Sequence, residues 1–195
     1  MKVNKKFLAL ASVAAVALPV TVWAATTTIE ATANFQTAIT LGNEVNMDFS
    51  NVEFSAAPAG GDTASLGTDG AIAYAGNFGG AGTGTPGEVE ITAGDVGATV
   101  EIFCDVGAIM AEAGGGTIDV VSVGVSMAPA AFGALSACNG TGGAAATTHV
   151  LAGGGADVIL LGGQIDGGTA VGFVAGAYST ATAGGDDIQV DVFYQ

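Results

Sequence analysis

The sequence predicts an all-β protein, an antiparallel sandwich of roughly eight to ten short strands. In many short segments apolar and polar residues alternate with a period of two, as they do in a strand with one buried face and one solvated face. Glycine-rich breaks separate these segments, and the chain contains 33 glycines. This glycine density disfavours long helices, because each Gly inside a helix costs about 1 kcal/mol relative to Ala.

The first alternating segment covers residues 29–41. Its apolar face comprises Ile29, Ala31, Ala33, Phe35, Ile39 and Leu41. The alternation continues over 45–54 and changes parity near Ser50, which predicts a bulge or a bend at that point. The stretch 55–87 consists mainly of Gly- and Pro-containing turns around a short candidate strand at 71–75.

Further strands are expected after residue 87. They lie at residues 88–91, 100–104, 121–127, 147–151, 157–161, 170–174 and 188–194. The clearest alternation is in the last of these segments, with Ile188, Val190, Val192 and Tyr194 on its apolar face. One helical turn is expected within 105–113, where the glycines that follow would end it.

The N-terminus has the three-part order of a secretory signal peptide. Three lysines open the chain, an apolar run follows over residues 7–22, and Ala24 places a small residue before the expected cleavage point. The run is shorter than the about 20 apolar residues that a membrane-spanning helix needs. We therefore expect residues 1–24 to be removed and the mature chain to be secreted.

Cleavage would leave a chain without Lys or Arg. The three basic residues all precede residue 25, whereas the 18 acidic residues all follow it. Such a chain cannot neutralise phosphates, so nucleic-acid binding is excluded. Attraction to an anionic membrane surface is excluded for the same reason, and we expect no direct membrane binding.

The chain has two cysteines, Cys104 and Cys138. An even cysteine count in an exported chain favours one disulfide, and a pair of free buried thiols is the alternative. A disulfide that closes a loop of this length stabilises a fold by roughly 3–4 kcal/mol.

The residue types needed for catalysis are scarce. His149 is the one histidine, and residues 25–195 contain no Lys or Arg to hold charge in a transition state. Glu88 and Glu90 share a strand face as a glycosidase pair could, but two carboxylates on a solvated strand explain them equally well. We expect no catalytic residues, no enzyme activity and no cofactor.

Four aspartates lie in Gly-containing turns, where oxygen ligands could bind Ca²⁺. They are Asp62, Asp69, Asp186 and Asp187. Their spacing matches no calcium-loop signature, and aspartate is a common turn former. We therefore expect no metal site.

The two ends of the mature chain suggest how it assembles. A strand at the end of a sheet leaves an unpaired edge unless something covers it, and the final alternating segment is such a strand. Residues 29–41 of a neighbouring subunit could cover this edge by strand addition, or they could pair within their own subunit. The expected organisation is a signal peptide at 1–24, an N-terminal extension or first strand at 25–41, and a sandwich domain at 42–195.

In these residues the chain resembles pilins of the chaperone–usher type. It is also similar to a secreted bacterial family of pilin-like domains of unknown function. The resemblance implies an immunoglobulin-like sandwich that is incomplete and is completed by a donor strand. The donor strand would carry Ile29, Ala31, Ala33 and Phe35, and the C-terminal edge strand would carry Ile188, Val190, Val192 and Tyr194.

The resemblance implies a function without chemistry. The chain would be a structural subunit of a bacterial surface fibre, a fimbrium used in cell adhesion, reached through the periplasm. Its partners would be other copies of itself or related subunits, a periplasmic chaperone and an outer-membrane usher. The alternative is a self-complete secreted sandwich that binds a glycan or calcium.

Overall fold

The computed structural model describes residues 33, 35–153 and 155–195. The chain divides into two units after residue 34, and the fold below is that of the second unit. The expected signal peptide at 1–24 and the expected donor residues Ile29 and Ala31 lie outside the described residues.

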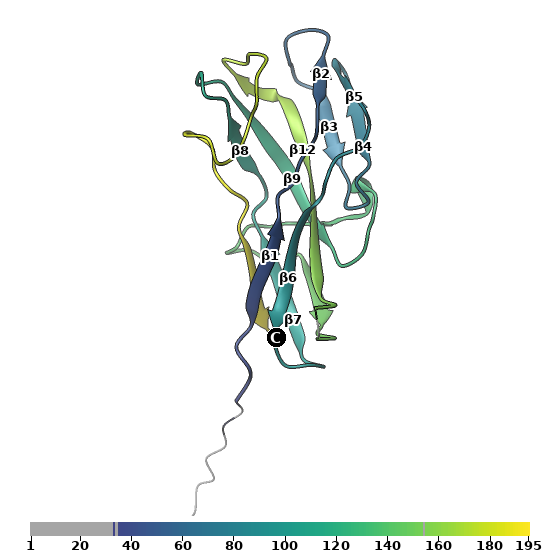
Figure 1. Ribbon diagram of the computed structural model, residues 1–195, viewed down its shortest axis with the longest axis vertical. Coiled ribbons are helices and arrows are strands. Elements are labelled where there is room, and N and C mark those ends of the chain that lie inside the picture. Colours follow the sequence, from purple (N-terminus) through teal and green to yellow (C-terminus); the bar gives the residue numbers. More distant parts are fainter. Residues whose placement is uncertain (1–32, 34, 154) are drawn as a thin grey trace, which may run out of the picture. The chain divides into compact units, whose positions relative to one another are not determined.

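The second unit is built from antiparallel strands, so the predicted all-β fold class is confirmed (Figure 1). In the described part of the chain, helix is limited to one 3-10 turn, η1 (Phe132–Ala134). None of the described residues forms a helix that is long and apolar enough to cross a membrane.

The larger sheet is organised around one long strand, β12 (Val158–Val171), whose first residues are a continuous apolar run. On one side β12 pairs first with β6 and then with β3, and on the other side it pairs with β9. The surrounding strands are β1 (Thr40–Val45), β3 (Thr63–Leu66), β4 (Ile72–Ala75), β6 (Gly87–Ala93), β8 (Ala108–Ala111), β9 (Thr117–Ser126) and β10 (Ser136–Ala137).

The register of the larger sheet places apolar residues in rows across the strands. Leu161 of β12 lies opposite Gly87 of β6 and Val125 of β9. Four residues further along β12, Ile165 lies opposite Ala64 of β3 and Val120 of β9. β1 lies outside β6, and β4 lies outside β3.

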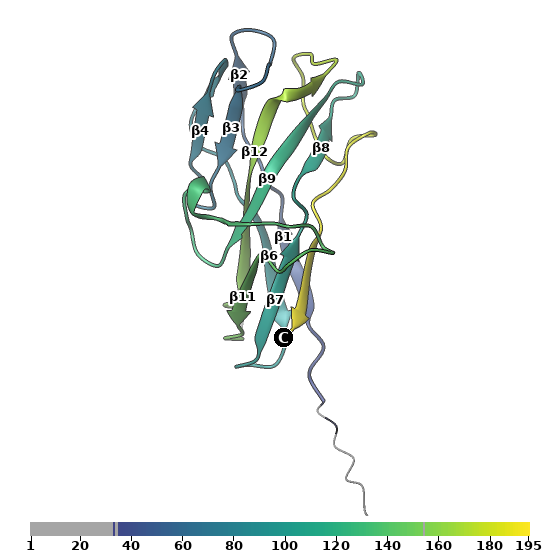
Figure 2. The same ribbon diagram turned by 180° about the vertical axis from the view of Figure 1, so that it is seen from behind.

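A second sheet covers one end of the first. It contains β7 (Thr99–Cys104) between β11 (Thr147–Val150) and β13 (Val190–Tyr194), and Figure 2 shows these strands on the face turned away in Figure 1. Alternate residues of β7 are fully buried, whereas those between them are partly exposed. A ribbon of β2 (Val52–Phe54) and β5 (Phe78–Gly80) lies at the other end of the unit.

The core fills the space between the two sheets. Val100 and Ile102 of β7 pack in one cluster with Ile91 of β6 and Ile159 of β12. Each of these four side chains has no more than a few per cent of its surface exposed. Apolar burial of this kind contributes about 25 cal/mol per Å² and is the main term that holds the sandwich together.

The predicted disulfide between Cys104 and Cys138 is present. Cys104 is the last residue of β7 in the smaller sheet, and the Cys138 N–H donates to the carbonyl of Val123 in the larger sheet. The bond therefore ties the two sheets together, and it closes a loop with a sequence separation of 34 residues.

Several strand predictions need correction. Residues 35–39 form no strand, and regular pairing begins at Thr40. The helical turn expected within 105–113 is wrong, because that segment contains β8, which pairs with β9. The strands expected at 157–161 and 170–174 overlap the two ends of one strand, β12, and residues 172–174 lie beyond its end.

Near Ser50, where a bulge or a bend is expected, the backbone departs from a regular strand conformation. Ser50 has a positive φ of 56°, a conformation that L-residues other than Gly rarely adopt. Its N–H donates to the Asp48 carboxylate at 2.7 Å, within the irregular connection between β1 and β2.

Candidate functional site

An open apolar groove separates two segments that are distant in sequence. One wall is formed by residues 44–54, which include the end of β1 and the start of β2, and the other wall by residues 173–190, which lead into β13. Two adjoining cavities of about 440 and 450 Å³ share Met47, Phe49, Met110 and Tyr178, and together they are called here the open groove.

The floor of the open groove is the hydrophobic core itself. Phe49, Ile118 and Ile165 line one cavity, and Val120 and Leu161 line the other. All five belong to the buried core cluster. Each of the five has only a few per cent of its surface exposed, so the floor is already packed.

Each wall makes backbone hydrogen bonds on one side. On the first wall, Asp48 exchanges two backbone bonds of 2.8 Å with Thr85. On the second wall, Ser179 exchanges two bonds of 3.0 Å with Ala111, and β13 then pairs with β7. Within the described ranges no backbone hydrogen bond joins one wall to the other.

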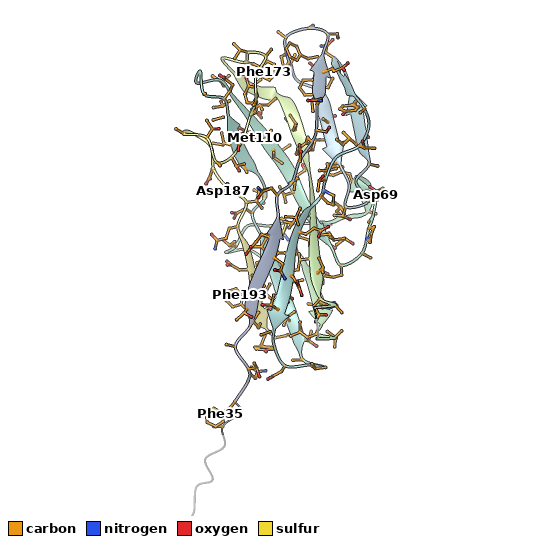
Figure 3. All side chains as sticks on the ribbon, viewed as in Figure 1. Phe35, Asp69, Met110, Phe173, Asp187 and Phe193 are labelled. Atoms are coloured by element: carbon orange, nitrogen blue, oxygen red, sulfur yellow. A yellow bond between two sulfur atoms is a disulfide. The ribbon has the colours of Figure 1, made fainter. Side chains whose placement is uncertain are left out.

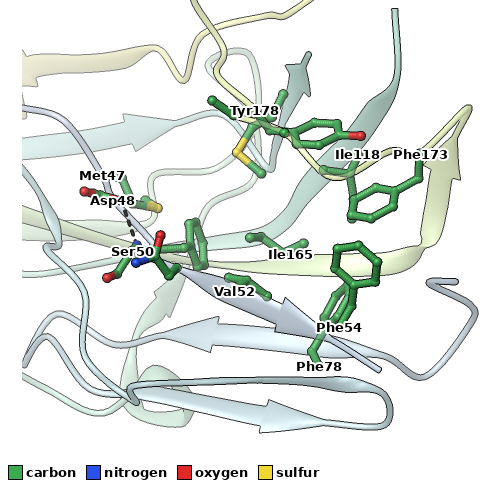
Figure 4. Close-up of a pocket in the computed structure, with 15 residues that line it drawn as sticks. Met47, Asp48, Ser50, Val52, Phe54, Phe78, Ile118, Ile165, Phe173 and Tyr178 are labelled. Atoms are coloured by element: carbon green, nitrogen blue, oxygen red, sulfur yellow. Dashed lines mark hydrogen bonds between the residues drawn. The ribbon is translucent and has the colours of Figure 1, made fainter. Parts of the chain in front are cut away.

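Three aromatic residues gather where the groove reaches β2 (Figure 4). The rings of Phe54 and Phe173 meet edge to face at 5.1 Å, and Phe173 stacks on Tyr178 at 5.1 Å. The Tyr178 hydroxyl donates to the Val174 carbonyl and accepts from the Val174 N–H, which fixes its ring. We call Phe54, Phe173 and Tyr178 the aromatic cluster.

The other end of the groove lies at β13, where acidic residues surround it. Glu44, Glu88 and Asp187 line this cavity together with Ile188 and Val190. Of the predicted edge-strand residues, Ile188 therefore precedes β13 and lines the groove, and Val190 begins the strand. Val192 and Tyr194 pack partly buried against the core.

Beyond the β13 end, a hydrogen-bonded clasp holds the chain that leads into β1. The Tyr194 hydroxyl donates to the carbonyl of Thr37 at 2.7 Å and accepts from the N–H of Asp95 at 2.7 Å. The Thr37 N–H donates to the Asp95 carboxylate at 3.1 Å. Immediately before this clasp, Phe35 points away from the domain with 92% of its surface exposed (Figure 3).

His149 lies on β11, away from the groove, and contacts the buried Asp157. His149 Nε2 is 2.7 Å from Asp157 Oδ1, and the same carboxylate accepts the N–H groups of Ala152 and Gly153. Burial alone would raise the pKa of the Asp157 carboxyl, but these three partners together hold it below its usual range. The arrangement ties β11 to the start of β12.

The turn aspartates of the first half of the chain are occupied by backbone groups. The Asp62 carboxylate accepts the N–H groups of Asn77 and Ala59, and the Asn77 N–H is the main reason that its pKa is lowered. Asp69 accepts the Ala71 N–H. Over the part of the chain that the structure describes, no group of three or more His, Cys, Asp or Glu side chains could hold a metal ion.

The sequence did not reveal the second wall of the groove or the aromatic cluster. Phe173 and Tyr178 stand in a stretch rich in Ala and Gly that shows no strand alternation over its second half. Phe173 contacts Phe54, more than 100 positions away, and Tyr178 stacks on Phe173; no local pattern encodes the first of these contacts. The sequence signal for this part of the groove is a pair of isolated aromatic residues among small residues.

No family model, no curated protein and no solved structure matches the chain.

Proposed function

We propose that the protein is a structural subunit of a bacterial surface fibre, completed by a strand that another copy donates. The open groove is the observation that carries this proposal. A strand placed in it would find backbone partners on both walls and apolar contacts on the floor, which are the two components of binding by strand addition.

Residues 29–35 have the sequence that this site requires. Ile29, Ala31, Ala33 and Phe35 alternate with polar residues, so one face of an extended segment is apolar. In extended form these residues cover roughly 20 Å at about 3.3 Å per residue, a length that the wall formed by residues 44–54 can accommodate. The small alanines suit a groove whose floor is already packed.

The clasp favours donation to another copy over self-pairing. Thr37 is held by Tyr194 and Asp95 at the β13 end of the domain. To enter its own groove, the chain would have to reverse direction between residues 36 and 39 and release these bonds. The exposed ring of Phe35 is already directed outward.

Head-to-tail donation does not close on itself, so repeated donation produces a filament. In this proposal the sandwich is incomplete and immunoglobulin-like, as the resemblance to pilins of the chaperone–usher type implies. A periplasmic chaperone protects the groove before assembly, an outer-membrane usher exports the subunit, and the fibre lies at the cell surface. The protein acts mechanically and needs no cofactor.

Assembly of the mature chain, residues 25–195, tests the proposal. We expect ladders on an unboiled denaturing gel and fibres in electron micrographs, both absent when residues 25–35 are deleted. Ala31→Asp, on the proposed donor face, should abolish the ladder because it would bury an unpaired carboxylate. Thr32→Asp is the matched control on the opposite face and should still assemble.

A single monomer band from all of these forms would reject the proposal. It would mean that the sandwich is complete without a donor, and binding of glycans or calcium would then be the function to test.

A further inference from the structure

The aromatic cluster presents apolar surface at the β2 end of the open groove. Phe54 is 40% exposed, and the neighbouring Val174 is 49% exposed. The rings of Phe173 and Tyr178 are held in place by stacking and by the hydroxyl bonds to Val174. The cluster is therefore an apolar surface that the described residues cover only in part.

Phe35 is an exposed aromatic residue at the opposite end of the same domain (Figure 3). With 92% of its surface exposed, its ring makes almost no contact within its own copy. It is also the last apolar residue of the proposed donor segment, which leaves residues 36–39 to reach β1 of the donating copy. These residues span roughly 13 Å in extended form, so the donating domain must lie close to the end of the groove that receives Phe35.

The geometry of a filament determines which end of the groove receives Phe35. The accepting copy sends out its own N-terminal segment at the β13 end, because the clasp holds Thr37 beside Tyr194. If the donating domain also lay at the β13 end, the N-terminal segments of both copies would meet there. The two copies could then exchange strands, which favours a closed dimer. A filament requires the donating domain at the β2 end, and therefore Phe35 at the aromatic cluster.

Charge favours the same direction. With Phe35 at the β2 end, the amino terminus that cleavage creates at Ala25 lies toward the β13 end. Glu44, Glu88 and Asp187 line that end of the groove. An α-amino group, positively charged near neutral pH, is attracted to such a carboxylate-rich end.

We infer that the aromatic cluster is an intersubunit docking site for Phe35 of the donating copy. This inference rests on the proposed function and specifies its contact: the ring of Phe35 packs against Phe54, Phe173 and Tyr178, and the donated strand runs antiparallel to β13. Aromatic rings favour such edge-to-face and offset-stacked contacts.

Disulfide trapping in the full mature chain tests this contact. One double variant carries Phe35→Cys and Phe54→Cys, and its matched control carries Phe35→Cys and Val45→Cys. Phe54 and Val45 are on the same wall at opposite ends of the groove and are 40% and 41% exposed. After mild oxidation we expect the first variant, and not the second, to give a ladder that survives boiling without reductant.

The outcomes separate this inference from the proposed function. Fibres that are cross-linked through Val45, or through neither position, would overturn the docking site while leaving donor-strand assembly intact. The absence of fibres from the wild-type chain would reject both.

A second measurement does not depend on new cysteines. Phe35 is exposed in its own copy, so Phe35→Ala leaves its own domain folded and weakens the intersubunit contact. Subunits should leave Phe35→Ala fibres in denaturant roughly tenfold faster or more than wild-type fibres, the result expected from the loss of a buried aromatic ring. Phe35→Tyr should stay close to wild type, and equal rates for all three would contradict the inference.

Discussion

The Tyr194 hydroxyl connects three parts of the chain that are far apart in sequence. It bonds to Thr37 before β1 and to Asp95 in the loop between β6 and β7, and its own residue ends β13. The two bonds fix the direction in which the N-terminal segment leaves the domain. In the proposed fibre, this direction favours donation to a neighbour over self-pairing.

Tyr194→Phe should weaken this control while keeping the aromatic ring. Loss of the hydroxyl removes two hydrogen bonds, each worth about 1 kcal/mol, and it allows the N-terminal segment to turn toward its own groove. We expect a lower free energy of unfolding in urea and a larger monomer fraction on an unboiled gel.

Tyr74→Phe is the matched control for this change. The Tyr74 hydroxyl is buried and has no hydrogen-bond partner among the described residues. Its removal should leave both the stability and the ladder unchanged, or raise the stability slightly. If Tyr194→Phe behaves in the same way as Tyr74→Phe, the clasp has no part in assembly.

Asp157 gives the fold a defined response to acid. The pKa of Asp157 is lower in the folded chain than in the unfolded chain, so the ionised carboxylate stabilises the fold. This stabilisation is fully present above the unfolded pKa, about 3.9 for Asp. It is lost as the pH falls through the folded pKa. Asp157→Asn should lower the free energy of unfolding at pH 7 by about 1–3 kcal/mol, because two backbone N–H groups and the His149 ring lose a charged acceptor.

The pH dependence is the sharper part of this prediction. Urea unfolding at pH 7 and pH 3 should show a smaller acid-induced loss in Asp157→Asn than in the wild type. The exposed Asp187→Asn is a suitable control. An equal acid-induced loss in Asp157→Asn and the wild type would show that Asp157 does not carry the response.

At the scale of the elements, β12 shows which parts of a long strand the sequence predicts and which it does not. Its outer ends alternate or are apolar, and both were predicted as separate short strands. Gly162 and Gly163 interrupt the pattern because neighbouring strands approach closely. A Cβ at Gly162 would lie 2.4 Å from the Leu66 carbonyl oxygen, and one at Gly163 would lie 2.8 Å from Val120. Close packing therefore requires glycine at these two positions, and the glycines interrupt the strand pattern in the sequence.

The same reasoning explains the rest of the comparison. Strands with strict alternation, such as β7 and β13, were predicted within one or two residues, because their burial pattern is local. The sequence does not predict β3, because this strand has only four residues, most of them small, and turn residues surround it. The candidate edge strand was found, but the groove was not, because its second wall is defined by tertiary contacts.

Gly162→Ala tests the close packing of β12. The added methyl group would contact the backbone of β3, which cannot move as a flexible side chain could, so we expect a loss of about 1–3 kcal/mol in the free energy of unfolding. Gly79→Ala in β5 is the control, because no atom lies within 4 Å of its added Cβ. Similar losses for both variants would show that the approach of β3 to β12 is not tight.

The charge of the whole molecule sets a condition for assembly. Residues 25–195 contain all 18 acidic residues and no Lys or Arg, so subunits that approach one another are strongly repelled. In the proposed fibre the apolar groove supplies the attraction, which depends little on salt, whereas the repulsion is screened over about 10 Å at 0.1 M salt. We therefore expect charge to limit assembly at low ionic strength.

The rate of ladder formation should consequently rise from 10 mM to 500 mM NaCl. Replacing exposed carboxylates that do not line the groove cavities, as in the double variant Glu53→Gln and Asp186→Asn, should speed assembly at low salt and reduce the response to salt. Such a result would locate the barrier in general repulsion rather than in the groove. A rate that falls with salt would instead mean that attraction between opposite charges, such as the Ala25 amine and the acidic β13 end, dominates the encounter.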